Sequence, residues 1–450
     1  MKEKAERRTS DQQNMKIVIL SSILGTTIEW YDFFLYGMAA SLVFGQLYFP
    51  GHDPAVGTLL AFATFAVGFV ARPVGGLIFG HIGDRIGRKK TLVTTMMIMG
   101  VATFLIGLVP TYDDIGILAP ILLVLCRVAQ GVAIGGEWGG AVLLAVEYAG
   151  PRRKGLYGSW PQVGLALGLL LGTGAFLLLS AAMDEAAFLA YGWRIAFLFS
   201  VVLVLIGMFV RLKVMETPAF TAMRSNQEAA TVPAAELLRD RFSRRHLLLG
   251  MGSRLAEGVA FNTWGVFILS YGVKSLGLHY SDLLRVVLVC SAVMVVFIPL
   301  FGHCSDRWGS RKTFALGAMI FTVLAYPVFG LFETRSLVVL TAALLIIFGV
   351  AYPLMYGPQA ALYCDLFPTK VRYTGISLVY QLSGIFASGL TPLILASLLA
   401  IGGTPWLMVA YLVLAGGIST ACTLAMRPMD SSADETRGAP RRSTPSLAAE

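Results

Sequence analysis

Charged residues are scarce in this chain of 450 residues. Asp, Glu, Lys and Arg make up only 14% of it, while 56% is hydrophobic and the mean hydropathy is +0.72. Soluble domains are about a quarter charged, so this composition excludes a string of soluble domains. A helix that crosses a bilayer needs about 20 apolar residues, and the chain is long enough for many such helices. The composition therefore predicts an all-α integral membrane protein.

The sequence motifs of common enzymes are also missing. The chain contains no G-x-x-x-x-G-K-[ST] phosphate loop, no H-E-x-x-H pair and no G-x-S-x-G turn. Its five cysteines form no C-x-x-C pair, and all lie in or beside apolar runs, which is typical of buried hydrophobic residues. We therefore expect no enzymatic activity, no metal and no cofactor. We attribute the net charge of +9 to the basic loops of a membrane protein, and therefore expect no nucleic-acid partner either.

Twelve apolar runs divide the chain. They lie at about 16–46, 54–80, 90–109, 117–147, 157–182, 193–214, 247–274, 281–304, 312–332, 336–365, 372–399 and 404–427. The polar, basic stretch 215–246 separates them six from six. We therefore predict an N-tail (1–15), two six-helix bundles (16–214 and 247–427), a central loop (215–246) and a disordered C-tail (428–450).

The distribution of Lys and Arg predicts the orientation in the membrane. Of these 35 residues, 28 lie in the two tails, the central loop and every second short connection. Positive loops face the cytoplasm, so both termini are expected there, in the inner membrane of a bacterium. Residues 1–13 have no short apolar core before a cleavage site, which argues for a cytoplasmic tail over a signal peptide.

A charged loop occurs twice, after the second span of each half. Gly80-His-Ile-Gly-Asp-Arg-Ile-Gly-Arg-Lys-Lys90 returns as Gly302-His-Cys-Ser-Asp-Arg-Trp-Gly-Ser-Arg-Lys312. A weaker repeat pairs the segment from Glu147 with the segment from Asp365. Two related six-helix halves with a site between them are a transporter architecture.

The duplicated loop resembles the signature of the major facilitator superfamily. Three further segments (Gly25–Gly37, Arg72–Gly76 and Arg127–Gly140), together with Glu216-Thr-Pro218, resemble its metabolite:proton symporters, with the shikimate-type branch closest in look. The resemblance covers about 16–427. It implies twelve transmembrane helices in two homologous six-helix bundles, and uptake of a metabolite together with protons. Members of that family import citrate, 2-oxoglutarate, shikimate, or proline and betaines.

Charged residues inside the predicted spans are candidates for function, because they are expensive in lipid. Glu29 and Asp32 lie on one face near the middle of the first span, with Tyr36 one turn further on. Two neighbouring carboxylates repel when both are ionised, so one of them is expected to load and release the coupled proton. The alternative is a permanent pairing with an arginine, and the sequence does not choose between the two acids.

Arg127 lies at mid-bilayer in the fourth span, with Gln130 and Glu137 on the same face. Its guanidinium fork suits a carboxylate, so it is expected either to bind an anionic substrate or to neutralise Glu29 or Asp32. In the other spans, Arg254 and Glu257 are expected to pair with each other. We expect Arg72 to reach the membrane surface near the end of its helix.

Other polar residues complete the predicted sites. Gln162, Asn262 and Gln381 are expected to line the substrate cavity, and Gly131, Gly135 and Gly139 to let a neighbouring helix approach closely. The duplicated loops are expected to act as a gate, in which Arg88 or Arg311 pairs with Glu147 or Asp365 when the cytoplasmic side closes. The predicted gating residues are Gly80, Asp84, Arg85, Gly87, Arg88, Glu147, Gly302, Asp306, Arg307, Gly309, Arg311 and Asp365.

The sequence thus predicts a secondary active transporter that imports a small organic acid with protons by alternating access. It needs no cofactor, since the proton gradient drives it, and its partners are a metabolite, protons and membrane lipids around a monomer. The alternatives are a proton-coupled carrier of a zwitterion such as proline or betaine, and an exporter of the same fold. An aromatic cage, which suits a quaternary amine, would mark the zwitterion carrier.

Overall fold

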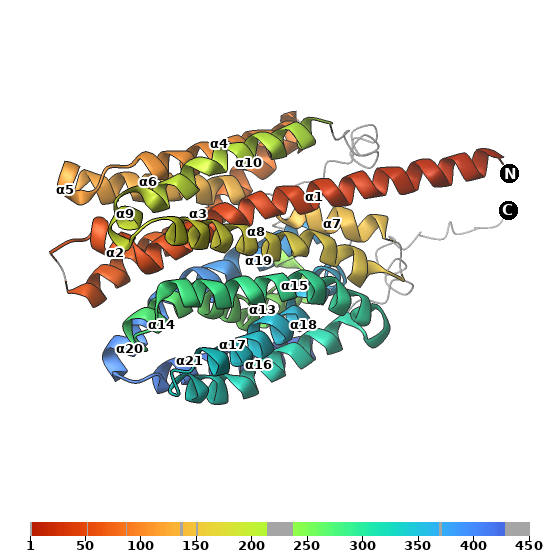
Figure 1. Ribbon diagram of the computed structural model, residues 1–450. Helices are drawn as coiled ribbons and strands as arrows, with labels where there is room; N and C mark the ends of the chain where they lie inside the picture. The colour runs from red at the N-terminus through yellow and green to blue at the C-terminus, as the bar shows by residue number, and fades with distance from the viewer. Residues whose placement is uncertain are drawn as a thin grey trace, which may run out of the picture.

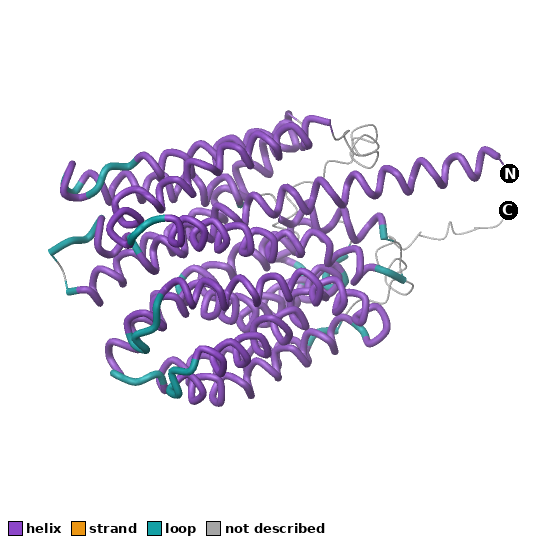
Figure 2. The backbone as a smooth tube through the Cα atoms, in the orientation of Figure 1, coloured by secondary structure: helices purple, strands orange, loops and turns teal. Residues whose placement is uncertain are grey.

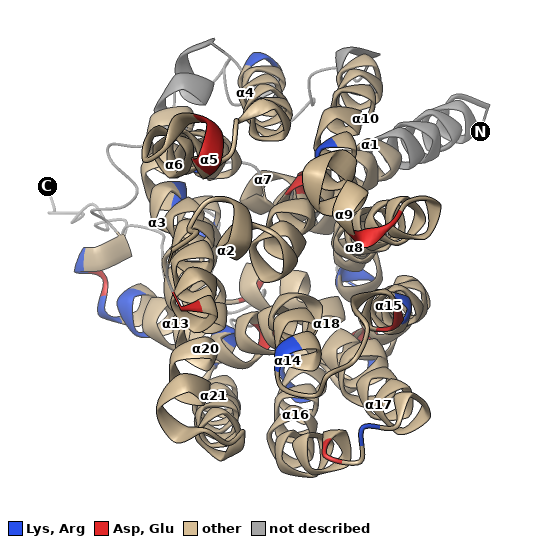
Figure 3. Ribbon diagram, turned by 60° about the vertical axis from the view of Figure 1, so that its left-hand side comes forward, with Lys and Arg blue, Asp and Glu red and all other residues tan. Residues whose placement is uncertain are grey.

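The computed structural model describes residues 2–427, except 52, 87, 136–137, 150–151, 214–236 and 369–370. Helices form almost all of that part of the chain, and it contains no strand (Figure 2). Charged residues are sparse along the ribbons, most of which are tan in Figure 3. Helices without strands are what a chain of long apolar runs forms in lipid, because each helix satisfies its own backbone hydrogen bonds.

The helices fall into two halves. The N-terminal half contains α1 (Lys2–Leu42), α2 (Phe44–Leu47), α3 (Pro54–Ile86), α4 (Arg88–Leu108), α5 (Tyr112–Ile115), α6 (Leu118–Ile134), α7 (Trp138–Tyr148), α8 (Lys154–Ala182), α9 (Glu185–Ala187), the π-helical turn η1 (Phe188–Gly192) and α10 (Trp193–Lys213). The C-terminal half contains α13 (Arg241–Asn262), η2 (Thr263–Phe267), α14 (Ile268–Lys274), α15 (Tyr280–Trp308), α16 (Ser310–Phe332), α17 (Leu337–Leu344), η3 (Leu345–Ala351), α18 (Tyr352–Cys364), α19 (Arg372–Gly384), η4 (Ile385–Gly389), α20 (Thr391–Gly402) and α21 (Trp406–Ala425).

Nine helical segments within the described residues are long and apolar enough to cross a membrane. They cover nine of the twelve predicted spans. The first, third and seventh predicted spans correspond to α1, α4 and the run from α13 to α14. In the last of these, Arg254, Glu257 and Asn262 lower the hydropathy. Some of the three spans that are not among these nine segments therefore owe their lower hydropathy to buried polar side chains.

The two halves lie side by side (Figure 1). Across their interface α8 packs along α15, and α3 packs against α19, η4 and α20. We call the end that carries the start of α8, the α15–α16 connection and the end of α21 the basic end. The opposite end carries α2, α5 and α14 (Figure 1).

Small residues bring α3 and α6 into close contact. A Cβ atom on Gly131 would overlap the carbonyl oxygen of Gly68, and one on Gly135 would overlap that of Arg72. This confirms the predicted role of Gly131 and Gly135, since backbones approach this closely only where side chains are absent. Gly139 faces Ser377 of α19, so the third glycine serves the contact between the halves.

Several boundaries differ from the prediction. The first helix begins at Lys2 and not at about residue 16, because the Lys-, Glu- and Gln-rich N-tail is itself a good helix former. The seventh span begins at Arg241 and not at 247, since the Asp240 side chain caps the helix by accepting from Ser243 N at 2.8 Å. The fourth predicted span corresponds to α6 and α7, on either side of residues 136–137, which lie outside the described residues. The predicted tail 428–450 lies outside the described residues.

Candidate functional site

Six buried charges lie inside the described part of the molecule. Arg72, Arg127 and Arg254 are 4%, 2% and 1% exposed, and Glu29, Asp32 and Glu257 are 5%, 1% and 3% exposed. Each arginine interacts electrostatically with one of the acids: Arg127 with Asp32, Arg72 with Glu29, and Arg254 with Glu257. Arg72 also interacts with Arg254, and Arg127 with Arg72. We call this set the charged cluster; among the described residues its charges balance.

In the N-terminal half, a chain of hydrogen bonds connects Asp32 to Arg127. Thr103 Oγ1 donates to Asp32 Oδ2 at 2.9 Å, Gln130 Nε2 donates to Thr103 Oγ1 at 2.7 Å, and Arg127 Nη1 donates to Gln130 Oε1 at 3.1 Å. The predicted residues Asp32, Gln130 and Arg127 are thus connected by hydrogen bonds. The connection runs through Thr103 of α4, which was not predicted. Asp32 Oδ1 accepts no hydrogen bond from any described group.

Aromatic rings support Arg127. Its guanidinium lies 4.2 Å from the ring centre of Tyr36 and 5.0 Å from that of Phe65. Tyr36 is held in turn by a 2.7 Å hydrogen bond from its hydroxyl to Thr64 Oγ1. Among the described residues no carboxylate lies within salt-bridge distance of Arg127, and its Nε has no acceptor. The site therefore holds a buried cation whose fork is only partly used.

Arg72 does not reach the membrane surface, so that prediction is wrong. Its guanidinium lies 4.2 Å from the ring centre of Phe69 and 5.4 Å from that of Phe33, deep between the halves. Helix α3 continues to Ile86, well beyond the predicted end of its span, and the face that carries Arg72 packs on α19 and η4. Cation–π contact with two rings, together with Glu29, replaces the water that snorkelling would have provided.

In the C-terminal half, Arg254 and Glu257 form the predicted pair, with Nε and Oε2 3.2 Å apart. Glu257 also accepts from Tyr352 OH at 2.9 Å and from Gln359 Nε2 at 3.2 Å. Arg254 Nη1 donates to the Tyr380 carbonyl at 3.0 Å and to Ser383 Oγ at 3.2 Å. Each of these two charges thus has a charged partner in direct contact, unlike Asp32 and Arg127.

This pair belongs to a closed ring of contacts that crosses the interface between the halves twice. Gln162 Nε2 of α8 donates to Gln359 Oε1 and to the Tyr356 carbonyl of α18, each at 3.2 Å. Trp138 Nε1 of α7 donates to Gln162 Oε1 at 3.0 Å. The Trp138 ring stacks on Tyr380 at 3.7 Å with an interplanar angle of 15°, and the Arg254 guanidinium lies 3.7 Å from the Tyr380 ring centre. We call the six side chains the cross-bundle ring: Trp138, Gln162, Gln359, Glu257, Arg254 and Tyr380.

Two of the predicted lining residues donate to backbone carbonyls. Asn262 donates to the Gly258 carbonyl of its own helix, one residue before η2 begins. Gln381 donates to the Gly135 carbonyl at 2.6 Å, which links α19 to the end of α6. Neither has a hydrogen bond to the charged cluster among the described groups. Glu137 lies outside the described residues.

Sequence reasoning missed Gln359 and Tyr352 altogether. They lie seven residues apart on one face of a span that is otherwise almost wholly apolar, and this spacing was a usable signal. Their π-helical neighbour η3 could not be predicted. The helices that carry the C-terminal part of the ring each adjoin such a turn: η2 follows α13, η3 precedes α18 and η4 follows α19. Turns of this kind often occur at functional sites.

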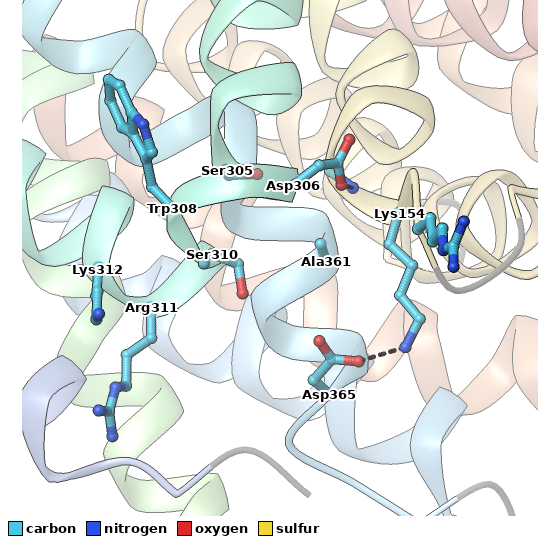
Figure 4. A pocket seen from close by; sticks show the side chains of 12 residues that line it. Lys154, Ser305, Asp306, Trp308, Ser310, Arg311, Lys312, Ala361 and Asp365 are labelled. Atoms are coloured by element: carbon cyan, nitrogen blue, oxygen red, sulfur yellow. Dashed lines mark hydrogen bonds and ion pairs between the residues drawn. The ribbon is translucent and has the colours of Figure 1, made fainter. Parts of the chain in front are cut away.

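At the basic end, Asp306 of α15 joins the two halves. Its Oδ1 accepts from Gly155 N at 2.7 Å and its Oδ2 from Leu156 N at 3.1 Å, so it caps the first turn of α8. Beside it, Lys154 of α8 forms a 2.8 Å salt bridge with Asp365 at the end of α18 (Figure 4). These residues line a cavity of about 420 Å³ at this end of the molecule, away from the charged cluster.

The partner predicted for Asp365 is wrong in one respect. Arg311 points away from Asp365 (Figure 4), and its Nη1 donates to the Met426 carbonyl at 2.6 Å. Lys154 lies closer because the start of α8 sits against α15 and α18, where Gly155 and Gly302 leave no side chains between the helices. Gly309 makes the turn between α15 and α16 at φ +89°, a conformation that favours glycine. Arg307 is exposed.

The rest of the predicted gate belongs to the first copy of the loop. Gly87 lies outside the described residues, as do the side chains and surroundings of Gly80, Asp84, Arg85, Arg88 and Glu147.

The opposite end is closed by different contacts. Lys274 at the end of α14 donates to the Pro54 carbonyl at 3.2 Å and to Thr58 Oγ1, both in α3. Nearer the centre, Ser41 Oγ of α1 donates to the Val266 carbonyl of η2 at 3.0 Å. With hydrogen bonds between the halves at both ends and a buried charged cluster between them, the molecule has the geometry of an occluded carrier.

Comparison with known proteins agrees with this geometry. The model of the Major Facilitator Superfamily matches residues 22–392. The shikimate transporter of Escherichia coli K12 is 40% identical over 409 residues, which cover 90% of this chain and 92% of that protein. The E. coli K12 proline/betaine transporter is 36% identical over 436 residues, 93% of this chain and 86% of that one. A solved D-xylose–proton symporter has a TM-score of 0.70 at 17% identity, covering 91% of this chain and 96% of its own.

Two paired helical bundles with a buried polar site between them define a membrane carrier. The chain belongs to the major facilitator superfamily. It is a multi-pass membrane transporter and not an enzyme, as its relatives are named transporters of that family. The predicted twelve-helix fold of two homologous bundles is confirmed.

Proposed function

We propose that this transporter imports a small organic acid together with a proton, by alternating exposure of the charged cluster to the two sides of the membrane. The observation that carries the proposal is the balance of three arginines and three carboxylates among the described buried residues. An anionic substrate that enters this cluster adds one negative charge. An unbalanced buried charge costs several kcal/mol, so binding of the anion favours uptake of a proton by one of the carboxylates.

Asp32 is the acid best suited to take that proton. Both oxygens of Glu257 already have partners, namely Arg254, Tyr352 and Gln359. Asp32 Oδ2 accepts a hydrogen bond from the Thr103 hydroxyl, whereas Oδ1 accepts none from any described group. A proton can therefore bind to Oδ1 without breaking a described hydrogen bond. Glu29 remains the second candidate, because it interacts with both Asp32 and Arg72.

Arg127 is the proposed anchor for the carboxylate of the substrate. Its Nε and part of its fork are free of described acceptors, while the rings of Tyr36 and Phe65 fix its plane. Through Gln130 and Thr103 it is connected to Asp32, so a carboxylate on Arg127 weakens the stabilisation of an ionised Asp32. Substrate binding and proton binding are thereby coupled.

The zwitterion carrier is the alternative, and the proline/betaine transporter among the relatives supports it. Four aromatic rings lie with their centres within 6.3 Å of one another: Trp30, Phe33, Phe34 and Phe261. Such a group of rings could form an aromatic cage. The organic acid is favoured because the shikimate transporter matches at higher identity and because Arg127 has a buried Nε without a described acceptor and no carboxylate in salt-bridge contact among the described residues. An exporter of the same fold would share every one of these contacts.

We place the protein as a monomer in the inner membrane, with the basic end and both termini in the cytoplasm. Arg152, Arg153, Lys154, Arg307, Arg311 and Lys312 gather at that end, as the positive-inside rule requires. A cysteine in place of the exposed Arg153 should react in whole cells only with membrane-permeant reagents. Reaction with an impermeant maleimide from outside would contradict this orientation.

The coupling is tested with Asp32→Asn in proteoliposomes, with shikimate as the first candidate substrate. The amide mimics a permanently protonated acid, so the variant should still exchange labelled substrate across the membrane. It should no longer concentrate substrate in response to an inward proton gradient. Glu29→Gln serves as the comparison. If both variants concentrate substrate as the wild type does, neither acid carries the proton.

A further inference from the structure

Three side chains of the cross-bundle ring, Trp138, Gln162 and Tyr380, have no role in the proposed cycle. The ring joins α7, α8, α13, α18 and α19, and its six side chains are at most 5% exposed. Its Arg254 and Glu257 belong to the charged cluster, which also contains the proposed carboxylate anchor Arg127. A buried polar ring at an interface that must open and close needs an explanation beyond packing.

The longest hydrogen bonds of the ring are those of its two glutamines. Gln162 Nε2 is shared between two acceptors of the other half at 3.2 Å, and within the C-terminal half Gln359 Nε2 reaches Glu257 Oε2 at the same distance. Trp138 Nε1 donates to Gln162 Oε1 at 3.0 Å. Long, shared hydrogen bonds are the weaker ones, so the ring opens most easily at the shared bond between Gln162 and Gln359.

A hydroxyl group has the chemistry to replace the bond between the two glutamines. It donates one hydrogen bond and accepts others at the same atom. Placed between the two glutamines, it accepts from Gln162 Nε2 and donates to Gln359 Oε1. A second hydroxyl donates to the Glu257 carboxylate, which Arg254 keeps charge-neutral as a pair.

We propose that the cross-bundle ring binds the hydroxyl groups of the transported acid while Arg127 holds its carboxylate, so that the preferred substrate is a hydroxylated carboxylic acid. The inference rests on the proposed function and deepens it, because it assigns the C-terminal half a role in selectivity. A betaine, which has no hydroxyl group, gains nothing from this part of the site.

The test compares two acids that differ only in hydroxyl groups. Shikimate carries three, and cyclohex-1-enecarboxylate carries none on the same ring. Binding of both is measured on the purified protein by calorimetry or by competition with a labelled ligand. The wild type should bind shikimate about 10-fold or more tightly than the deoxy acid, as expected for one or more added hydrogen bonds.

Gln162→Leu removes the ring glutamine of the N-terminal half, and Gln359→Leu removes that of the C-terminal half. Each should weaken shikimate binding about 3- to 10-fold and leave binding of the deoxy acid unchanged, so that the ratio of the two affinities falls. Unchanged binding of the deoxy acid also shows that the variant is folded. Gln381→Leu is the matched control: it removes a cross-bundle glutamine bond outside the ring and should leave the ratio as it is.

The outcomes separate this inference from the proposed function. If the wild type binds neither acid and instead binds betaine, the proposed function is wrong and the ring has no such role. If the wild type binds both acids and neither ring variant changes their ratio, the hydroxyl site alone is overturned. Equal loss of both acids in both variants would mean that the ring only holds the structure together, which also overturns the inference.

Discussion

The cap that Asp306 forms on α8 predicts that this one carboxylate biases the carrier toward closure at the basic end. Asp306→Asn keeps the shape and one acceptor but removes the charge and one of the two bonds to Gly155 N and Leu156 N. A negative charge at a partly buried helix N-terminus contributes up to about 2 kcal/mol, and about 1 kcal/mol at an exposed one. The loss should therefore raise the population open at the basic end by roughly 5- to 30-fold.

The change is measured as a distance distribution between spin labels at Lys90 and Lys312, which are exposed at the basic ends of α4 and α16 in opposite halves. The five native cysteines, all free thiols, are first replaced by serine. Asp306→Asn should shift the distribution toward long distances. The control is Asp282→Asn in the same helix, where the carboxylate pairs with Arg285 of its own turn at 2.9 Å. If Asp306→Asn and the wild type give the same distribution, the cap does not act as a latch.

Three further outcomes follow from the packing and the charges. A Cβ atom at Gly302 would lie 2.6 Å from Ser159 Cβ, so Gly302→Val should hold the basic end open and expose a cysteine placed at the buried Ser159. Gly330→Val is the control: a Cβ at Gly330 meets no atom within 4 Å, and this variant should leave that cysteine buried. Arg127→Ala should weaken substrate binding by roughly 10- to 150-fold, and Arg127→Lys in the same direction by less, since Lys lacks the two-donor fork; wild-type affinity in Arg127→Lys would contradict the anchor. Asp240→Ala should lower stability by about 1 kcal/mol as thermal inactivation reports it. Hydrogen bonds from Ser243 hold the pKa of Asp240 below its ordinary value. The stability that the Asp240 carboxylate contributes is therefore fully present above the ordinary pKa and is lost as the pH falls through the lowered pKa. In acid, the stabilities of the wild type and of Asp240→Ala should converge.

The helices and their grouping could be predicted because lipid makes them depend on composition alone. Apolar runs of sufficient length and a duplicated charged loop are visible without any structure, and the family comparison confirms the fold they imply. Boundaries failed where polar residues continue a helix, as at Lys2 and Arg241. Hydropathy does not record that Lys, Glu and Arg are good helix formers, nor that Asp240 caps α13.

For the site, single residues could be predicted but their partners could not. Burial cost identifies Asp32, Arg127 and Glu257 as unusual, and i,i+3 spacing correctly predicted the Arg254–Glu257 pair. Arg72 was misplaced because its neighbours, Phe33 and Phe69, come from two helices whose contact no pattern in the sequence reveals. The cross-bundle ring joins residues 197 positions apart at its Gln162–Gln359 step, and only tertiary packing brings them together.

On our proposal, a buried cluster with balanced charge makes an anionic substrate bring a proton with it. This coupling is measured by counting the protons taken up when purified transporter binds shikimate, by calorimetry at one pH near neutrality in buffers of different ionisation enthalpy. We expect uptake of about one proton per bound anion in the wild type and of none in Asp32→Asn, which should still bind. Tight binding of the anion by the wild type without proton uptake would show that the balance of charges does not couple the two.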